Sequence, residues 1–181
     1  MSDAPRRLNW GCGSQGEPGW VNADLKAGPG IDITGDIRDG LPVEDASFDY
    51  VVSIHALPMI SYPDLVRVLQ ELRRVLEPGG VLRLSLPDVD KGIAAYQRGD
   101  RDYFLVPDEN VRSLGGKFVV QMLWYGWSVT IFTADFIEEL LLAAGFSEVH
   151  HCAFQVTASG FEGITELDNR ERESLFVEAV K

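Results

Sequence analysis

The chain has 181 residues, of which 45% are hydrophobic and 24% charged, and its formal net charge is -12. These proportions are ordinary for a globular protein, and the length favours one domain over residues 1–181. The acidic balance without a basic run argues against a nucleic-acid partner, and no apolar run approaches the ~20 residues of a membrane span.

The first residues and the cysteines favour a cytoplasmic protein. Residues 1–7 contain no apolar stretch of the kind that a signal peptide requires. Cys12 and Cys152 form neither a metal-ligand pattern nor a disulfide framework. We therefore expect a protein of the cytoplasm, with no metal and no membrane partner.

Short apolar runs separated by turn residues predict strands over residues 7–10, 21–25, 31–34 and 50–54. The sequence Ala-Gly-Pro-Gly at 27–30 predicts a turn between the second and third of them. No full helix fits between the first and second strands, because the segment is short and contains a Pro-Gly pair.

The rest of the chain alternates helices and strands. Residues 63–76 have apolar residues at helical spacing, and the Pro-Gly-Gly that follows ends that helix before a strand over 81–86. Thr133 is a suitable N-cap for a helix over 134–144. Two final strands are predicted over 147–153 and 174–180. This alternation indicates an α/β fold with three layers.

Residues 99–130 are an insertion between the strand at 81–86 and the helix at 134–144. The segment is rich in aromatic residues. Loops beyond the carboxyl ends of strands form the ligand crevice in open α/β sheets. We therefore predict that this insertion covers a ligand.

A glycine loop follows the first strand and is followed by an acid. Gly11, Gly13 and Gly16 match the pattern G-x-G-x-x-G. In a dinucleotide-binding fold the ribose-binding acid lies about 20 residues further on. Here only seven residues separate Gly16 from Asp24. This spacing excludes an NAD-dependent oxidoreductase and requires another cofactor.

Five motifs in order resemble those of the class I S-adenosylmethionine-dependent methyltransferases. They are the loop Leu-Asn-Trp-Gly-Cys-Gly at 8–13, Asp24, the Asp-Ile pair at 36–37, Phe-Asp-Tyr-Val-Val-Ser at 48–53, and Leu-Glu-Pro-Gly-Gly-Val-Leu at 76–82. The resemblance is close over residues 7–90 and looser from 133 onward. It implies a Rossmann-like sandwich with a seven-stranded, mostly parallel sheet whose last strand is antiparallel.

The resemblance also implies which residues bind S-adenosylmethionine. Asp24 would accept hydrogen bonds from the two ribose hydroxyls, and Asp36 with the Ile37 amide would read the adenine edge. The remaining cofactor-binding candidates lie on the glycine loop and at the end of the strand at 50–54: Asn9, Gly11, Cys12, Gly13, Ser53 and His55.

The chain departs from the family pattern at three places. Gln15 stands where a third glycine is expected, and Asn9 stands where the family often has an acid. After the strand at 50–54 the chain has Leu57-Pro58-Met59 where many relatives have Leu-Glu-His. Any role that this acid and histidine carry in the family is therefore in doubt here.

The acceptor side has one candidate base and several aromatic residues. His55 is a candidate catalytic base because its ordinary pKa is near neutral, or else a packed residue that orders its loop. Four residues are candidates for binding the acceptor: Asp88, Trp124, Tyr125 and Trp127. The three aromatic residues among them are equally compatible with a core role.

Two further groups of residues are interpreted as structural. His150 and His151 alternate sides of a strand and so cannot jointly face one metal. The run of mixed charges over residues 166–173 is interpreted as a solvated loop between the last two strands.

The sequence thus predicts a methyltransferase that uses S-adenosylmethionine and acts on a small-molecule acceptor, for example a modified sugar or a lipid precursor. The alternative is a non-catalytic protein that binds the cofactor or a partner on the same fold. The motifs of nucleobase-methylating enzymes are absent from the sequence. Monomer and homodimer both remain open.

Overall fold

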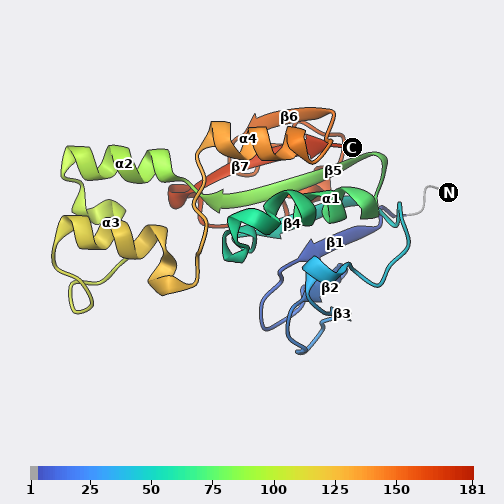
Figure 1. The fold of residues 1–181 in the computed structure, drawn as a ribbon, viewed down its shortest axis with the longest axis horizontal. Helices are drawn as coiled ribbons and strands as arrows, with labels where there is room; N and C mark the ends of the chain where they lie inside the picture. Colours follow the sequence, from blue (N-terminus) through green and yellow to red (C-terminus); the bar gives the residue numbers. More distant parts are fainter. Residues whose placement is uncertain (1–3) are drawn as a thin grey trace.

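A computed structural model describes residues 4–181. A seven-stranded sheet has the strand order β3-β2-β1-β4-β5-β7-β6. The strands are β1 (Arg7–Trp10), β2 (Val21–Asp24), β3 (Ile33–Thr34), β4 (Phe48–Ile54), β5 (Leu76–Pro87), β6 (Glu148–Cys152) and β7 (Ser174–Val180). The helices are α1 (Leu65–Val75), α2 (Val89–Arg98), α3 (Leu114–Met122) and α4 (Ala134–Ala143). Figure 1 shows the arrangement.

The topology confirms the predicted fold class. Strands β1 to β5 pair in parallel, and β7 pairs antiparallel with both β5 and β6. The predicted strand positions agree to within a few residues, except that β5 begins at Leu76 and has a register shift opposite residues 48–50. Among residues 4–181, no helix is long and apolar enough to cross a lipid bilayer.

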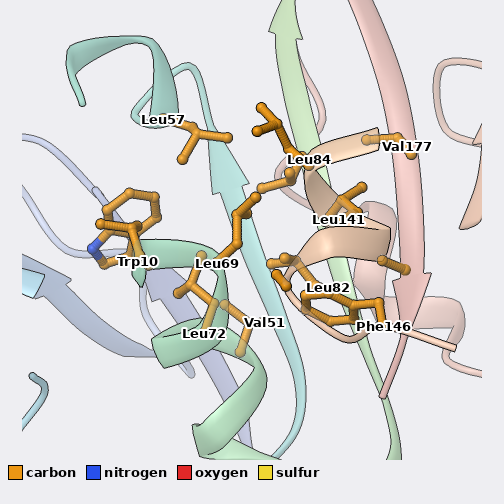
Figure 2. Close-up of a cluster of buried hydrophobic side chains, with 14 of the residues drawn as sticks. Trp10, Val51, Leu57, Leu69, Leu72, Leu82, Leu84, Leu141, Phe146 and Val177 are labelled. Atoms are coloured by element: carbon orange, nitrogen blue, oxygen red, sulfur yellow. The ribbon is translucent and has the colours of Figure 1, made fainter. Parts of the chain in front are cut away.

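One face of the sheet carries the main hydrophobic core. Helices α1 and α4 both lie across this face (Figure 1). Figure 2 shows Leu69 and Leu72 of α1 near Val51 of β4, and Leu141 of α4 near Leu82 of β5. All five side chains are fully buried. The apolar stripe predicted for the first helix therefore packs on the sheet.

The opposite face is covered by an irregular segment. Side chains alternate along a strand, so Tyr50 and Val52 of β4 lie on the face opposite Val51. They form a smaller cluster with Trp20 and with Ile164, which belongs to the connection between β6 and β7. We call residues 153–173 the β6–β7 connection. It builds the third layer that the fold class predicts, without an α-helix among its described residues.

Arg83 of β5 fixes this connection to the sheet. Its side chain is fully buried, and all five of its N–H groups donate hydrogen bonds. Asp168 accepts two of them at 2.8 and 2.6 Å, Glu178 of β7 accepts one at 2.7 Å, and the carbonyls of Ala153 and Val156 accept the others. The guanidinium therefore links the beginning and the end of the β6–β7 connection to β5 and β7.

The interpretation of residues 166–173 as a solvated loop holds for Glu166 and for residues 169–172, which are exposed. It is wrong for Asp168 and Glu173, which are buried. Asp168 is buried because it pairs with the buried cation on β5, which is 85 residues away from it in the sequence. The sequence of a mixed-charge segment does not show which of its charged side chains pair with a buried residue elsewhere in the chain.

Beyond the end of β5 the chain forms a small helical lobe, residues 89–127. Helices α2 and α3 pack against each other, and they lie apart from the sheet (Figure 1). Ala95, Tyr103 and Phe104 form the buried centre of this lobe. The lobe contains most of the insertion that the sequence places over residues 99–130.

Replacing Arg83 tests the role of the buried ions. Arg83→Met leaves Asp168 and Glu178 buried without a cation, and such a loss costs about 3–5 kcal/mol of unfolding free energy. Urea unfolding at neutral pH measures this loss. Arg67→Met on the exposed side of α1 is the control and should change stability by no more than about 0.5 kcal/mol. Equal stabilities of the two variants would contradict the proposed role of Arg83.

Candidate functional site

A cavity of about 760 Å³ lies at the carboxyl ends of the parallel strands. This volume lies within the range of about 300–1,000 Å³ that small-molecule sites occupy. We call one end the cofactor end, because most of the candidates for binding S-adenosylmethionine lie there. It is formed by the end of β1 and the segments that follow β1, β2 and β3: residues 10, 11, 13, 14, 24–29 and 35–38. We call the other end the acceptor end. It is formed by the ends of β4 and β5, the segment after β4, the helical lobe with the residue that follows it, and the β6–β7 connection: Ile54, His55, Ala56, Met59, Ile60, Pro87, Gln121, Met122, Trp124, Trp127, Ser128, Arg170 and Glu173.

The glycine loop passes close to the segment after β4. Gly11 has φ +73°, and a Cβ at this position would lie 2.1 Å from the Cβ of Ala56. A side chain is therefore excluded on two grounds. The Gly13 amide donates to Asp24 Oδ2 at 2.8 Å, and this bond joins the loop to the end of β2. Cys12 lies between these glycines, but its side chain is not part of the cavity lining.

The connection from β1 to β2 contains no helix, as predicted. Gly16 donates its amide to the Pro29 carbonyl, and a Cβ on Gly16 would lie 1.9 Å from the Gly30 carbonyl oxygen. The third glycine of the pattern therefore permits a close backbone contact with the 27–30 turn.

Asn9 lies beneath this connection. Its buried side chain donates to Asn22 Oδ1 at 3.1 Å, and Asn22 in turn bonds the backbone of Glu17 and Trp20. The two asparagines thus satisfy the irregular backbone between the strands. The structure places Asn9 outside the cavity lining.

Asp24 lies at the cavity wall with capacity to accept further hydrogen bonds. Its two oxygens accept one backbone amide each, from Gly13 at 2.8 Å and from Lys26 at 3.2 Å. A carboxylate offers about four lone-pair sites. Two hydroxyl donors can therefore be added without displacing either amide.

Asp36 lies on the next strand end and is oriented by Arg38. It caps the short 3-10 turn Ile37–Asp39 and forms an ion pair with the Arg38 guanidinium at 2.6 Å. The hydrogen bonds from Arg38 lower the pKa of Asp36. The side chains of Asp36 and Arg38 are held together at the cofactor end, and Ile37 is buried beside them.

Ser53 and His55 take different positions at the end of β4. Ser53 is buried within the strand and does not line the cavity. His55 lines the cavity, has φ +54°, and pairs through Nε2 with the hydroxyl of Ser174 at 2.7 Å. Burial, with a smaller contribution from Arg170, lowers the pKa of His55 to about 3. The ring is therefore neutral near pH 7.

The Leu57-Pro58-Met59 segment holds the helical lobe. The Pro58 carbonyl accepts the amides of Val129 and Thr130 at 2.9 and 3.1 Å. Leu57 is buried in the main core, whereas Met59 lines the cavity. Residues 57–59, where the chain departs from the family pattern, thus link the end of β4 to residues 129 and 130, which follow the lobe.

The aromatic residues of the insertion are divided between the cavity and the surface. Trp124 and Trp127 line the cavity, although Trp127 is also 65% exposed to solvent. Tyr125 does not line the cavity; its side chain is exposed and accepts a hydrogen bond from Asn110. Trp124 and Tyr125 have φ of +40° and +57°, in the left-handed region that residues other than glycine rarely adopt. Such strain is found at ligand sites that the surrounding structure holds in place.

Asp88 is a helix cap. Its side chain accepts the Lys91 amide at 3.0 Å at the start of α2, and Asp88 does not line the cavity. The structure therefore brings Trp124 and Trp127 to the acceptor end, and it does not bring Asp88 and Tyr125 there.

Three residues at the acceptor end were not identified from the sequence. Arg170 lies 5.3 Å from the ring centroid of Trp124 and pairs with Glu173 at 3.4 Å, and Gln121 lies on α3 nearby. No local motif marks any of them. The β6–β7 connection and the lobe are far apart in the sequence and come together only in the folded structure. Among the residues described, no cluster of His, Cys, Asp and Glu is arranged to hold a metal.

Comparison with known proteins identifies a methyltransferase domain. Residues 10–84 match the family model described as "Methyltransferase domain". The chain is 32% identical to a demethylmenaquinone methyltransferase of Staphylococcus carnosus over 123 residues, which are 67% of this chain and 49% of that protein. It is 44% identical over 54 residues to a phthiotriol/phenolphthiotriol dimycocerosates methyltransferase of Mycobacterium ulcerans, covering 30% and 19% of the two chains. The chain thus spans about half or less of the curated relatives it matches.

Solved structures share the fold at low sequence identity. A SAM-dependent methyltransferase from Thermotoga maritima aligns with a TM-score of 0.59 at 17% identity, over 100% of this chain and 84% of that one. One from Archaeoglobus fulgidus aligns with a TM-score of 0.59 at 10% identity, over 98% and 86%. The family model covers the residues that build the cofactor end of the cavity. Residues 10–84 therefore form a methyltransferase domain, and the fold is that of the class I S-adenosylmethionine-dependent methyltransferases, whose cofactor is S-adenosylmethionine.

Proposed function

We propose that this protein transfers a methyl group from S-adenosylmethionine to a small-molecule acceptor. The observation that carries the proposal is the continuity of the cavity. The glycine loop and Asp24 lie at one end, and a mainly apolar wall with Trp124 and Trp127 lies at the other. A volume of about 760 Å³ has room for a cofactor and a small second molecule.

The cofactor end provides the contacts that S-adenosylmethionine requires. Asp24 has free lone pairs for the ribose hydroxyls. Gly11 leaves room for the amino-acid part of the cofactor beside the loop. Asp36, oriented by Arg38, and the Ile37 amide face the adenine in this proposal. The bound cofactor supplies an activated methyl group.

The acceptor end supports a small molecule. Its lining is mainly apolar, and the net charge of -12 disfavours an anionic polymer. The relatives named for demethylmenaquinone and for phthiotriol/phenolphthiotriol dimycocerosates carry the names of small molecules. A cytoplasmic location, where such acceptors and the cofactor are available, is part of the same proposal.

The chain's contribution to catalysis is mainly the positioning of the acceptor. The two tryptophans and Met59 line this end and restrict the orientation of the acceptor, and alignment alone provides a large rate gain. His55 is neutral and accessible from the cavity, so it can accept a hydrogen bond or a proton from the acceptor. Its lowered pKa makes it a weak base. This favours acceptors that ionise readily.

The first prediction concerns Asp24. Asp24→Asn keeps the size of the side chain and one carbonyl acceptor, but it removes the charge and part of the capacity to accept ribose hydroxyls. Each lost hydrogen bond to a charged group is worth roughly 1.5–3 kcal/mol, or about a 10- to 100-fold loss of affinity. Titration calorimetry with S-adenosylhomocysteine measures it. Asp90→Asn, on the exposed surface of α2, should bind as the wild type does. Unchanged affinity in Asp24→Asn would refute the ribose assignment.

The second prediction uses the pKa of His55. Its folded value of about 3 lies below the ordinary 6.5, so the unfolded chain takes up the proton first. The stability that neutral His55 contributes is complete above about pH 6.5, and it is lost as the pH falls from there toward about 3. The loss reaches about 1.4 kcal/mol per pH unit.

His55→Asn should remove this pH dependence, because asparagine tolerates a positive φ and does not titrate. Urea unfolding at a series of pH values compares the variants, with the exposed His150→Asn as the control. Parallel stability curves for wild type and His55→Asn would contradict the lowered pKa.

The third prediction separates the acceptor from the cofactor. Trp124→Ala should lower methyl transfer to a protein-free metabolite extract by about 10-fold, which is the loss of roughly 1.4 kcal/mol of aromatic contact. Affinity for S-adenosylhomocysteine should remain within about 2-fold of the wild type. Tyr96→Ala, an exposed aromatic of α2 in the same lobe, is the control. Transfer of radiolabelled methyl groups is the measurement, and absence of transfer by the wild type would favour a non-catalytic binding protein.

A further inference from the structure

Gln121 lines the cavity, and its side chain carries a buried hydrogen-bond donor that has no partner among residues 4–181. It lies in the last turn of α3, its side chain is 2% exposed, and it lines the acceptor end. Its Oε1 accepts the Leu105 amide at 2.6 Å. Its Nε2 is buried and has no hydrogen-bond partner among residues 4–181.

The position of the donor is determined by this contact. The Leu105 N–H can pair only with the oxygen of the side-chain amide, so the NH₂ group must lie on the other side. A buried donor without a partner costs free energy, and folded proteins leave few of them. The described residues contain five such buried side-chain atoms, and Gln121 is the residue among those five that lines the cavity.

The surroundings of Gln121 indicate what its partner is. Met122, Trp124 and Trp127 provide an apolar and aromatic wall. The charged groups at this end, Arg170 and Glu173, pair with each other at 3.4 Å. Because their opposite charges offset each other, this end of the cavity favours a neutral oxygen on an apolar frame over a charged acceptor.

We infer that Gln121 Nε2 donates a hydrogen bond to an oxygen of the methyl acceptor, and that the acceptor is a neutral, mainly apolar, oxygen-bearing molecule such as a ketone, an enol or a phenol. The inference rests on the proposed function, which identifies this end of the cavity as the acceptor end. Gln121 is then a specificity-determining residue: an analogue without the oxygen leaves its donor unpaired.

A matched pair of probes tests the inference. 1-Tetralone carries a carbonyl oxygen where tetralin carries a methylene group, and the two molecules otherwise have the same frame. Each is titrated into ¹⁵N-labelled protein saturated with S-adenosylhomocysteine. We expect 1-tetralone to bind about 10-fold more tightly than tetralin, the worth of one hydrogen bond, and to shift the Gln121 side-chain amide resonance.

Two substitutions distinguish recognition from structural support. Gln121→Glu keeps an oxygen for the Leu105 amide, whereas Gln121→Met loses both groups at similar size. Both variants should bind the two probes with equal affinity. Lys117→Met is the control. Lys117 is also a buried polar residue of α3, it bonds the Val106 carbonyl and Asp108, and it does not line the cavity. This variant should keep the 10-fold preference even if the lobe is destabilised.

The outcomes separate the two proposals. Failure of the wild type to bind S-adenosylhomocysteine would overturn the proposed function. If that ligand binds, then equal affinity for the two probes, absence of binding by both, or an unmoved Gln121 resonance at saturating 1-tetralone would overturn the inference. A preference for 1-tetralone that persists in both Gln121 variants would overturn it as well.

Discussion

The buried guanidinium of Arg83 is the interaction on which the site depends. A cation on a central strand is stable only if acceptors surround it, and the β6–β7 connection supplies them with its own backbone and with Asp168. Two residues after Asp168 comes Arg170, which lies over Trp124, and Glu173 follows at the cavity wall. The ion pairs of Arg83 hold the β6–β7 connection on one face of the sheet. They therefore also help to position Arg170 and Glu173 at the acceptor end of the cavity.

The missing crossover helix between β1 and β2 and the long irregular connection between β6 and β7 explain why polar residues occupy unusual positions. Where a helix would satisfy its own backbone, an irregular connection needs side chains to do so. Asn9 and Asn22 serve the connection between β1 and β2, and Arg83 serves the connection between β6 and β7. This is the physical reason for the asparagine at position 9. Asn9 donates to Asn22 Oδ1, whereas the carboxylate of an acid at this position would have no N–H to donate to that oxygen.

The sequence predicted the sheet well because strand positions depend on short-range patterns. Of the candidates for binding the cofactor, Asn9, Cys12 and Ser53 do not line the cavity, whereas the others do. Alternation and turn residues locate each strand, and Asp24 and Asp36 follow strands whose carboxyl ends meet at one edge of the sheet. The acceptor end was predicted only in part. Trp124 and Trp127 were identified from composition, but Gln121 and Arg170 carry no local signal. Their place depends on how α3 and the β6–β7 connection approach the end of β4.

The same limit applies to residues on the strands themselves. The resemblance implies that Ser53 lies beside the cofactor, because it is at the end of β4, but its side chain is buried within the sheet and does not line the cavity. His55, two residues later, follows the strand and adopts a positive φ that lets it line the cavity. Position in a motif indicates the end of the strand, whereas the pleat and the backbone conformation decide which side chain reaches the ligand.

The segment after β4 influences the chemistry of the site through its backbone. Where relatives often carry an acid and a histidine, this chain has a proline whose carbonyl holds residues 129 and 130 and therefore the lobe. The acceptor wall is thus fixed by backbone hydrogen bonds, and few ionisable groups remain beside it. His55 is kept neutral by burial, and Arg170 is paired with Glu173. A site with this composition is suited to aligning a neutral acceptor with an already activated methyl group, because that reaction depends more on orientation and exclusion of water than on a strong base.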